Sequence, residues 1–236
     1  MTDVDYCKWA DYIEGIFKRN SLAPVLIADL GCGTGSFCLE MARRGYDMIG
    51  IDISVEMLSR AVSKLELSGV DKEKVLFLHQ DMAGFELYGT VDAIVSLMDS
   101  VNYITEKSRL VRMFKLVKNY LNPSGLFIFD INSIYKFEEI LDNNVFYSID
   151  DDISFIWQNK YNRKNKLCEF NLTFFVKEGE LYRRFEEVHY ERAYSVEEIS
   201  KVIRDTGLEL TGIYGGFNFQ NPGEKSERLF FVCRKS

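Results

Sequence analysis

The sequence predicts an α/β fold: a mostly parallel sheet of seven strands with helices on both faces, plus a small antiparallel β insertion. Short apolar runs without polar alternation, such as residues 25–30, are typical of strands buried on both faces. Segments with apolar residues three and four apart lie between these runs, which indicates β–α–β crossovers. After Asn132 this alternation stops, and several β-patterned segments follow one another.

Length and composition indicate one globular domain with a modest insertion. The chain has 236 residues, of which 47% are hydrophobic and 28% charged, and this usage excludes intrinsic disorder. A chain of this length buries enough surface to fold without disulfides or metal ions. Its five cysteines are odd in number and form no CxxC pair, which argues against a secreted disulfide framework and against a zinc site.

Charge and hydropathy restrict the partners. The net charge of −7 disfavours nonspecific binding to nucleic acids without excluding a nucleic acid as partner. The start of the sequence is acidic, and no apolar run approaches the roughly 18 residues that span a bilayer. We therefore expect a cytoplasmic protein, monomeric or homodimeric, that does not enter a membrane.

In the first 132 residues, helical and strand patterns alternate. Tyr6, Trp9 and Ile13 begin an amphipathic helix that ends near Asn20. Glycines that follow helical patterns mark where later helices end. The expected strands are residues 25–30, 48–53, 75–79, 91–98 and 126–131, and the expected helices between them are residues 36–44, 54–68 and 108–121.

After Asn132 we expect a short helix at 136–141 and then strands at 146–149, 153–161, 167–176 and 181–190. Ser195 and Glu198 have the spacing of a capping box, and Gly207 ends the helix that they begin. Residues 208–214 and 228–233 are the last two strands. The chain is therefore divided into an α/β core (1–144), an antiparallel insertion (145–192) and a segment that completes the core (193–236).

A glycine-rich loop, Asp29-Leu-Gly-Cys-Gly-Thr-Gly-Ser36, connects the first buried strand to the next helix. This turn lies at the carboxyl edge of a parallel sheet, where open α/β sheets bind their ligands. Glycines there let the main chain bend and let a ligand approach it closely. A dinucleotide-binding GxGxxG motif would place its third glycine at position 36, where this chain has Ser36. A second acidic residue, Asp52, ends the following strand.

An acidic residue, alternating glycines and a second acidic residue on the next strand resemble the class I S-adenosylmethionine-dependent methyltransferases, which have a Rossmann-like fold. The resemblance covers nearly the whole chain and implies S-adenosyl-L-methionine as cofactor. It implies that Asp29 organises the loop, that Asp52 holds the ribose diol and that Ile53 packs on the adenine. The full set of cofactor contacts that it implies is Asp29, Gly31, Cys32, Gly33, Gly35, Asp52, Ile53, Asp81, Met82 and Met98.

Each of these residues also has an ordinary structural interpretation. The glycines could form a mere tight turn, Asp52 could assist the cap of the next helix, and Asp81 could be a solvated loop carboxylate. The order of these residues along the predicted elements favours the cofactor site over the separate alternatives.

Methyl transfer from a sulfonium can be catalysed largely by positioning, so few dedicated catalytic groups are required. Asp99, Asn102 and Tyr103 follow the fourth strand of the core, where the family places its acceptor-side motif. They do not form the Asn/Asp-Pro-Pro-Tyr/Phe tetrapeptide typical of enzymes that methylate nucleic-acid bases or glutamine, and the alternative is a simple turn. His189 on the insertion is a candidate base, against the alternative of a solvent-facing or structurally paired histidine.

Three oxygen-bearing side chains, Asp99, Asp130 and Asn132, are expected at adjacent strand ends. They resemble the ligand types of the magnesium site in catechol-type O-methyltransferases. Their spacing does not match that family, so we predict no metal site.

Within the class, the chain is most similar to small bacterial methyltransferases with an antiparallel insertion after the fifth strand. These include amino-sugar N,N-dimethyltransferases, in which the insertion covers the acceptor. Those relatives use a tyrosine from the N-terminal segment as a lid; here that contribution is either absent or supplied by Tyr6, Trp9 or Tyr12. We predict methyl transfer to nitrogen or oxygen of a small molecule.

Two alternatives remain open at this point. A non-catalytic protein could bind the cofactor as a regulatory signal. An RNA methyltransferase, such as one acting on tRNA, could bind phosphates through the basic residues Arg163, Lys164, Lys166, Arg183 and Arg184.

Overall fold

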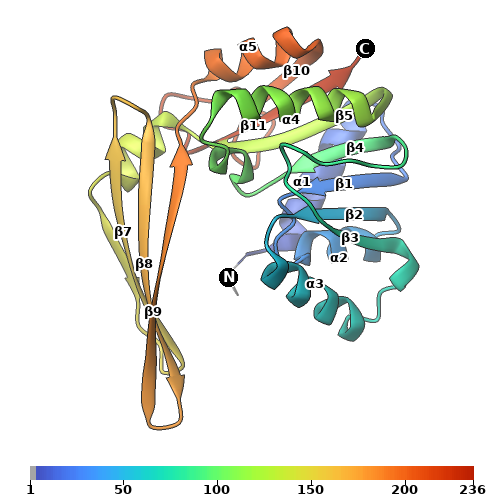
Figure 1. The fold of residues 1–236 in the computed structure, drawn as a ribbon. Coiled ribbons are helices and arrows are strands. Elements are labelled where there is room, and N and C mark those ends of the chain that lie inside the picture. Colours follow the sequence, from blue (N-terminus) through green and yellow to red (C-terminus); the bar gives the residue numbers. More distant parts are fainter. Residues whose placement is uncertain (1–3) are drawn as a thin grey trace.

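The computed structural model describes residues 4–236 and confirms the predicted α/β fold. Its core is a seven-stranded sheet in the order β10-β11-β5-β4-β1-β2-β3 (Figure 1). Only β11 runs antiparallel to its two neighbours; the other pairs are parallel. The strands are β1 (Leu26–Leu30), β2 (Asp47–Asp52), β3 (Val75–His79), β4 (Val91–Ser96), β5 (Leu121–Asn132), β10 (Leu208–Gly215) and β11 (Arg228–Lys235).

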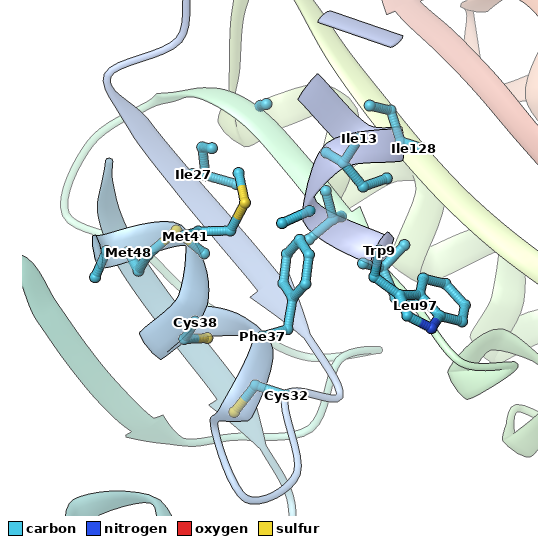
Figure 2. Packing of buried hydrophobic residues seen from close by; sticks show 14 of the residues in the cluster. Trp9, Ile13, Ile27, Cys32, Phe37, Cys38, Met41, Met48, Leu97 and Ile128 are labelled. Atoms are coloured by element: carbon cyan, nitrogen blue, oxygen red, sulfur yellow. The ribbon is translucent and has the colours of Figure 1, made fainter. Parts of the chain in front are cut away.

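Helices cover both faces of this sheet. The apolar side chains of α1 (Tyr6–Arg19), α2 (Ser36–Arg43) and α3 (Val55–Leu67) belong to one buried cluster, and those of α4 (Lys107–Tyr120) and α5 (Val196–Thr206) to another. Figure 2 shows the first cluster, where Phe37 of α2 packs near Ile13 of α1 and Ile27 of β1. Burial of these two layers fixes the strand ends that carry the candidate site.

The insertion forms a second sheet in the order β6-β7-β8-β9 that extends away from the core (Figure 1). Its strands are β6 (Val145–Ser148), β7 (Ile153–Asn162), β8 (Leu167–Glu178) and β9 (Leu181–Arg192), all paired antiparallel as predicted. The predicted short helix before it is a π-helix, η3 (Lys136–Leu141). Phe137 and Leu141 of η3 pack against Tyr161, Cys168 and Phe170, which attaches this sheet to the core.

Several local features differ from the sequence prediction. β5 begins at Leu121 instead of residue 126, because its pairing with β4 resumes after a register shift. A 3₁₀ helix, η2 (Ser100–Tyr103), replaces the expected turn after β4, and a second one, η1 (Lys72–Lys74), precedes β3. No helix among residues 4–236 has the length and apolar character needed to cross a membrane.

Two of the three candidate lid residues belong to the core. Trp9 packs edge-on against Phe217, and Tyr12 donates a hydrogen bond from its hydroxyl to the backbone oxygen of Asn218 at 2.8 Å. Both side chains are buried, so they are fixed in position. Tyr6, at the start of α1, is the only one of the three that is not buried.

Candidate active site

The glycine loop turns sharply between β1 and α2. Gly31, Gly33 and Gly35 all have positive φ angles, of 78°, 54° and 70°. The bend is held by the N–H groups of Gly31 and Cys32, which both donate to the backbone oxygen of Ile51 at 2.8 and 3.0 Å. A Cβ atom added at Gly31 would lie 2.8 Å from the hydroxyl of Ser100, whereas one added at Gly33 would meet nothing within 4 Å. The main chain is therefore open to a ligand at Gly33.

Asp52 lies at the end of β2 with its carboxylate directed to this loop. Its Oδ2 accepts a hydrogen bond from the N–H of Gly33 at 2.8 Å, and its Oδ1 accepts one from the N–H of Ser54 at 2.8 Å. Each oxygen keeps a lone pair, so the carboxylate can still accept two hydrogen bonds from a vicinal diol. The next side chain, Ile53, is 64% exposed, which leaves an apolar surface beside the carboxylate.

Asp29, at the end of β1, is only 3% exposed and lies beneath the loop. The thiol of Cys38 donates to its Oδ2 at 3.4 Å. Burial raises the pKa of Asp29 to about 7, with a smaller contribution from Asp52 in the same direction and an opposing one from the Cys38 hydrogen bond. Asp29 is therefore suited to supporting the loop and has almost no surface for a direct ligand contact.

Asp81 and Met82 follow β3. The two oxygens of Asp81 accept hydrogen bonds from Arg109 at 2.6 Å and from the N–H of Ala83 at 2.9 Å. The methyl group of Met82 lies 3.2 Å from the position of a Cβ at Gly31, so Met82 contacts the loop region. His79, which ends β3, contacts the backbone oxygen of Ile53 through Nε2 at 2.9 Å.

The chain makes a strained turn after β4. Met98 and Asp99 both have φ angles of 58°, a left-handed conformation that non-glycine residues seldom adopt. Their N–H groups donate to the two carboxylate oxygens of Asp130 at 2.7 and 3.0 Å. Asp130 is fully buried at the end of β5, so it holds this turn from inside the sheet.

Arg228 at the start of β11 bridges Asp130 and Asp99. Its guanidinium donates to Asp130 and also to Oδ1 of Asp99, the latter at 2.8 Å. The guanidinium also lies 5.4 Å from the centre of the Trp9 ring. Desolvation raises the pKa of Asp130, while the charge of Arg228 opposes that rise. The sequence analysis missed Arg228, which lies 98 residues from Asp130 in the chain and belongs to no local motif.

The other predicted acceptor-side residues divide into two groups. Asn102 is fully buried: its oxygen accepts from the N–H of Asn132 at 3.0 Å, and its amide donates to the oxygen of Arg192 at 2.8 Å. Asn102 thus joins β5 to the end of β9 and lies behind the surface of the site. Tyr103 is half-exposed, and its ring lies 6.1 Å from the ring of His189.

His189 reaches Tyr103 from β9 of the insertion. Its Nε2 lies 3.2 Å from a carboxylate oxygen of Glu187. Burial raises the pKa of Tyr103, and the nearby carboxylates of Glu191, Asp99 and Glu187 raise it further. The structure thus brings Asp99, Tyr103 and His189 to one place and surrounds that place with negative charge. Glu191 is a second residue that the sequence analysis missed.

Comparison with known proteins agrees with this geometry. Residues 27–125, which contain the glycine loop and Asp52, match the family model described as a methyltransferase domain. The Bacillus subtilis (strain 168) protein YqeM, described as a methyltransferase, is 36% identical over 239 residues, and the match covers 100% of this chain and 93% of the relative.

Solved structures extend the agreement to the whole fold. An S-adenosylmethionine-dependent methyltransferase from Clostridium acetobutylicum ATCC 824 is 34% identical, with a TM-score of 0.90 over 99% of this chain and 93% of that chain. CalS10, an S-adenosylmethionine-bound amino pentose methyltransferase from Micromonospora echinospora in calicheamicin biosynthesis, has a TM-score of 0.78 at 18% identity, over 100% and 93% of the two chains, a likeness of fold alone. The chain therefore belongs to the S-adenosylmethionine-dependent methyltransferases, and S-adenosyl-L-methionine is its cofactor.

Proposed function

We propose that this enzyme transfers a methyl group to a nitrogen or oxygen atom of a small molecule, which binds between the η2 segment and the insertion. The observation that carries the proposal is the contact between Tyr103 of η2 and His189 of β9, whose ring centres are 6.1 Å apart. This contact sets the inner end of β9 beside η2, which follows β4 and whose Ser100 borders Gly31 of the glycine loop. An acceptor held between these elements and the cofactor would be small enough to be enclosed. The amino pentose acted on by CalS10 is a small-molecule acceptor of this kind.

In the proposed cofactor pose, the residues predicted from the motif act together. The open main chain at Gly33 receives the methionyl part, the remaining lone pairs of Asp52 accept the ribose diol, and the exposed side chain of Ile53 covers the adenine. Asp81 and Met82 border the adenine, with Arg109 holding the Asp81 carboxylate. Cys32, Gly35 and Met98 line the same space, and Asp29 supports the loop from below. Two observations support this pose: the Asp52 carboxylate is directed to the loop by its bonds to Gly33 and Ser54, and the space beside Gly33 is open.

Bound S-adenosyl-L-methionine supplies an activated methyl group on a positively charged sulfur. The protein's contribution is to hold the acceptor atom in line with that methyl group and to exclude water, which can account for most of the rate. The rigid turn at Met98 and Asp99, held by Asp130, gives the acceptor a fixed wall. A proton acceptor is needed where the acceptor atom arrives protonated.

The basic side chains favour a small acceptor over RNA. Arg163 pairs with Glu138 at 3.8 Å, Lys166 with Glu198 at 2.8 Å and Arg183 with Glu178 at 3.3 Å. Carboxylates beside these cations weaken the attraction for phosphates. Arg163 and Lys166 lie at one end of the insertion strands and Arg183 near the other end. Nine residues of β9 separate the two ends, which corresponds to about 30 Å. Binding of tRNA that weakens with salt would favour the RNA alternative instead.

Two experiments test the proposal. Calorimetry is expected to show micromolar binding of S-adenosylhomocysteine and no detectable binding of NAD; binding of NAD instead would contradict the proposed cofactor pose. The enzyme is then incubated with methyl-labelled cofactor and, in parallel reactions, with a deproteinised, low-molecular-mass cell extract and with total cellular RNA. Label in a small molecule is the expected result, and label only in RNA or in no fraction would contradict the proposed acceptor class. We also propose a cytoplasmic location, in line with the five free cysteines.

A further inference from the structure

Glu191 is a buried carboxylate at the inner end of β9. Side chains alternate along a strand, so Glu191 projects from the same face of β9 as His189, which contacts Tyr103. Glu191 is only 3% exposed. Its Oε2 accepts a hydrogen bond from the side-chain amide of Asn132 at 3.2 Å, and among residues 4–236 no other donor bonds to this carboxylate. The other oxygen, Oε1, forms no hydrogen bond with residues 4–236 and is not fully enclosed by them, so a small ligand or water can reach it at the inner end of β9.

Charged and titratable groups surround Glu191 on several elements. Arg228 of β11 is bonded to Asp99 and Asp130, and Lys136 of η3 donates to Asn132 at 2.9 Å, so neither cation is bonded to Glu191. Burial, followed by the charge of Asp99, raises the pKa of Glu191 well above its ordinary value, against the opposing effects of Asn132, Lys136 and Arg228. Tyr103 of η2, Cys168 of β8 and His189 on the same face of β9 are further titratable groups nearby.

Three carboxyl groups, those of Asp99, Asp130 and Glu191, lie near the two cations of Arg228 and Lys136. The raised pKa of Glu191 means that its neutral form is favoured while no cation contacts it, and a cation bound beside it would favour the carboxylate form. Buried carboxylates without full hydrogen bonding are costly, and they persist where the group has a function. A protonated nitrogen placed beside the unpartnered oxygen of Glu191 would supply both the missing hydrogen bond and that cation.

We propose that Glu191 binds the protonated nitrogen of the methyl acceptor and takes its proton when the methyl group is transferred. This inference rests on the proposed function, because it requires a small acceptor between β9 and η2. In the step, a proton moves from the acceptor nitrogen to the carboxylate of Glu191, and the freed lone pair attacks the methyl carbon. The new N–C bond forms as the S–C bond breaks, and the electron pair of that bond stays on sulfur, which becomes a neutral thioether.

Glu191 replaces His189, the base candidate from the sequence, in this role. His189 is partly exposed and pairs with the half-exposed Glu187, so water can reach both groups. Glu191 lies nearer the core on the same face of the strand and is far less exposed than His189, which suits a proton acceptor that also binds a cation.

The test compares the wild type with Glu191→Gln, which preserves the shape of the side chain but cannot accept the proton as a carboxylate does. The control is Glu186→Gln, on the outer face of the same strand. Each protein is given methyl-labelled cofactor and the low-molecular-mass extract, the labelled product is identified, and its rate of formation is measured from pH 6 to 9. Binding of S-adenosylhomocysteine, measured by calorimetry, shows whether each variant is folded.

We expect a labelled amine, with Glu191→Gln slower than the wild type by about 10²- to 10⁴-fold at pH 7. We also expect this deficit to shrink about tenfold per pH unit, because the acceptor then loses its proton to solvent before binding. The cofactor product should bind equally to all three proteins. A Glu191→Gln rate within threefold of the wild type, a deficit that does not change with pH, or an O-methylated product would overturn the inference and leave the proposed function standing. No labelled small molecule with any of the three proteins would overturn both.

Discussion

The candidate active site has two halves: a cofactor half around the glycine loop and an acceptor half around the turn at Met98 and Asp99. Each half contains a buried aspartate, Asp29 in the first and Asp130 in the second, and the two halves stabilise their carboxylates differently. In the cofactor half, Asp52 accepts hydrogen bonds from the N–H groups of Gly33 and Ser54, and Asp29 is buried with a pKa of about 7. All the groups involved lie within about two dozen residues of one another. The main chain thus stabilises the Asp52 carboxylate without a cation, and the ion pair of this half, Arg109–Asp81, is partly exposed.

In the acceptor half, the partner comes from the far end of the chain. Asp130 receives the N–H groups of Met98 and Asp99 and also the guanidinium of Arg228, which lies 98 residues away from it. Arg228 further binds Asp99 across 129 residues. The hydrogen bonds of the cofactor half can therefore form between residues close in sequence, whereas those of the acceptor half require β11 to be paired in the sheet.

The largest expected effect comes from Arg228→Met, which leaves Asp99 and Asp130 without their cation. Removing one partner of a buried ion pair typically costs about 3–5 kcal/mol in the free energy of unfolding. Urea unfolding followed by circular dichroism measures this cost.

The matched control for that variant lies in the cofactor half. Arg109→Met breaks the Arg109–Asp81 pair, whose side chains are 43% and 38% exposed, and we expect a loss under about 1 kcal/mol. The double variant Arg228→Met/Asp130→Asn should recover part of the loss. If Arg228→Met and Arg109→Met had equal effects, the contrast between the two halves would be wrong.

This contrast also explains how much the sequence could predict. The alternation of buried runs and amphipathic segments predicted the sheet, its helices and the insertion, because each pattern is local. The glycine loop and Asp52 form a motif for the same reason, since 19 residues separate Gly33 from Asp52.

The acceptor half has no comparable local signal. In the sequence, Arg228 looks like any residue at the start of a strand. Glu191 is one of several charged residues in Glu186-Glu-Val-His-Tyr-Glu-Arg192. Asn102 is predicted on the acceptor side from its place after β4, and its buried amide joins β5 to β9, a role that no local pattern indicates. Only the pairing of β11 with β5 and the contact of β9 with η2 show that Arg228 and Glu191 lie near Asp99.

A second prediction concerns Asp29, the buried carboxyl group of the cofactor half, which has no cation bonded to it among residues 4–236. Because the pKa of Asp29 is about 7 in the folded protein and 3.8 is its ordinary value, the folded state binds a proton that the unfolded state has released. The free energy of unfolding should therefore fall as the pH rises from about 4 to 7, by about 2–4 kcal/mol from this residue.

Asp29→Asn removes that titration. Urea unfolding at pH 5 and pH 8 should show a smaller fall for the variant than for the wild type, so that the variant gains stability relative to the wild type at the higher pH. Arg228 cannot compensate Asp29, because it is bonded to Asp99 and Asp130. If the free energy of unfolding changed equally with pH in the two proteins, Asp29 would be ionised in the folded state. The two halves would then both stabilise charged carboxylates, which would contradict the contrast between them.

The smallest of the three effects is expected for Asp52→Ala. This variant tests whether Asp52 only stabilises the glycine loop or also binds the cofactor. The carboxylate makes two hydrogen bonds to the main chain and, in the proposed pose, two more to the ribose. Loss of charged hydrogen bonds should weaken S-adenosylhomocysteine binding by about 1.5–3 kcal/mol, or roughly 10- to 150-fold, as measured by calorimetry.

The control for Asp52→Ala is Asp71→Ala, which removes an exposed aspartate that accepts the N–H of Glu73 at 3.0 Å outside the site. Its affinity for S-adenosylhomocysteine should equal that of the wild type. If Asp52→Ala lost stability but kept its affinity, Asp52 would only brace the loop, as Asp130 braces the turn at Met98 and Asp99. The two halves would then use their carboxylates in the same way, and the ribose would need another acceptor.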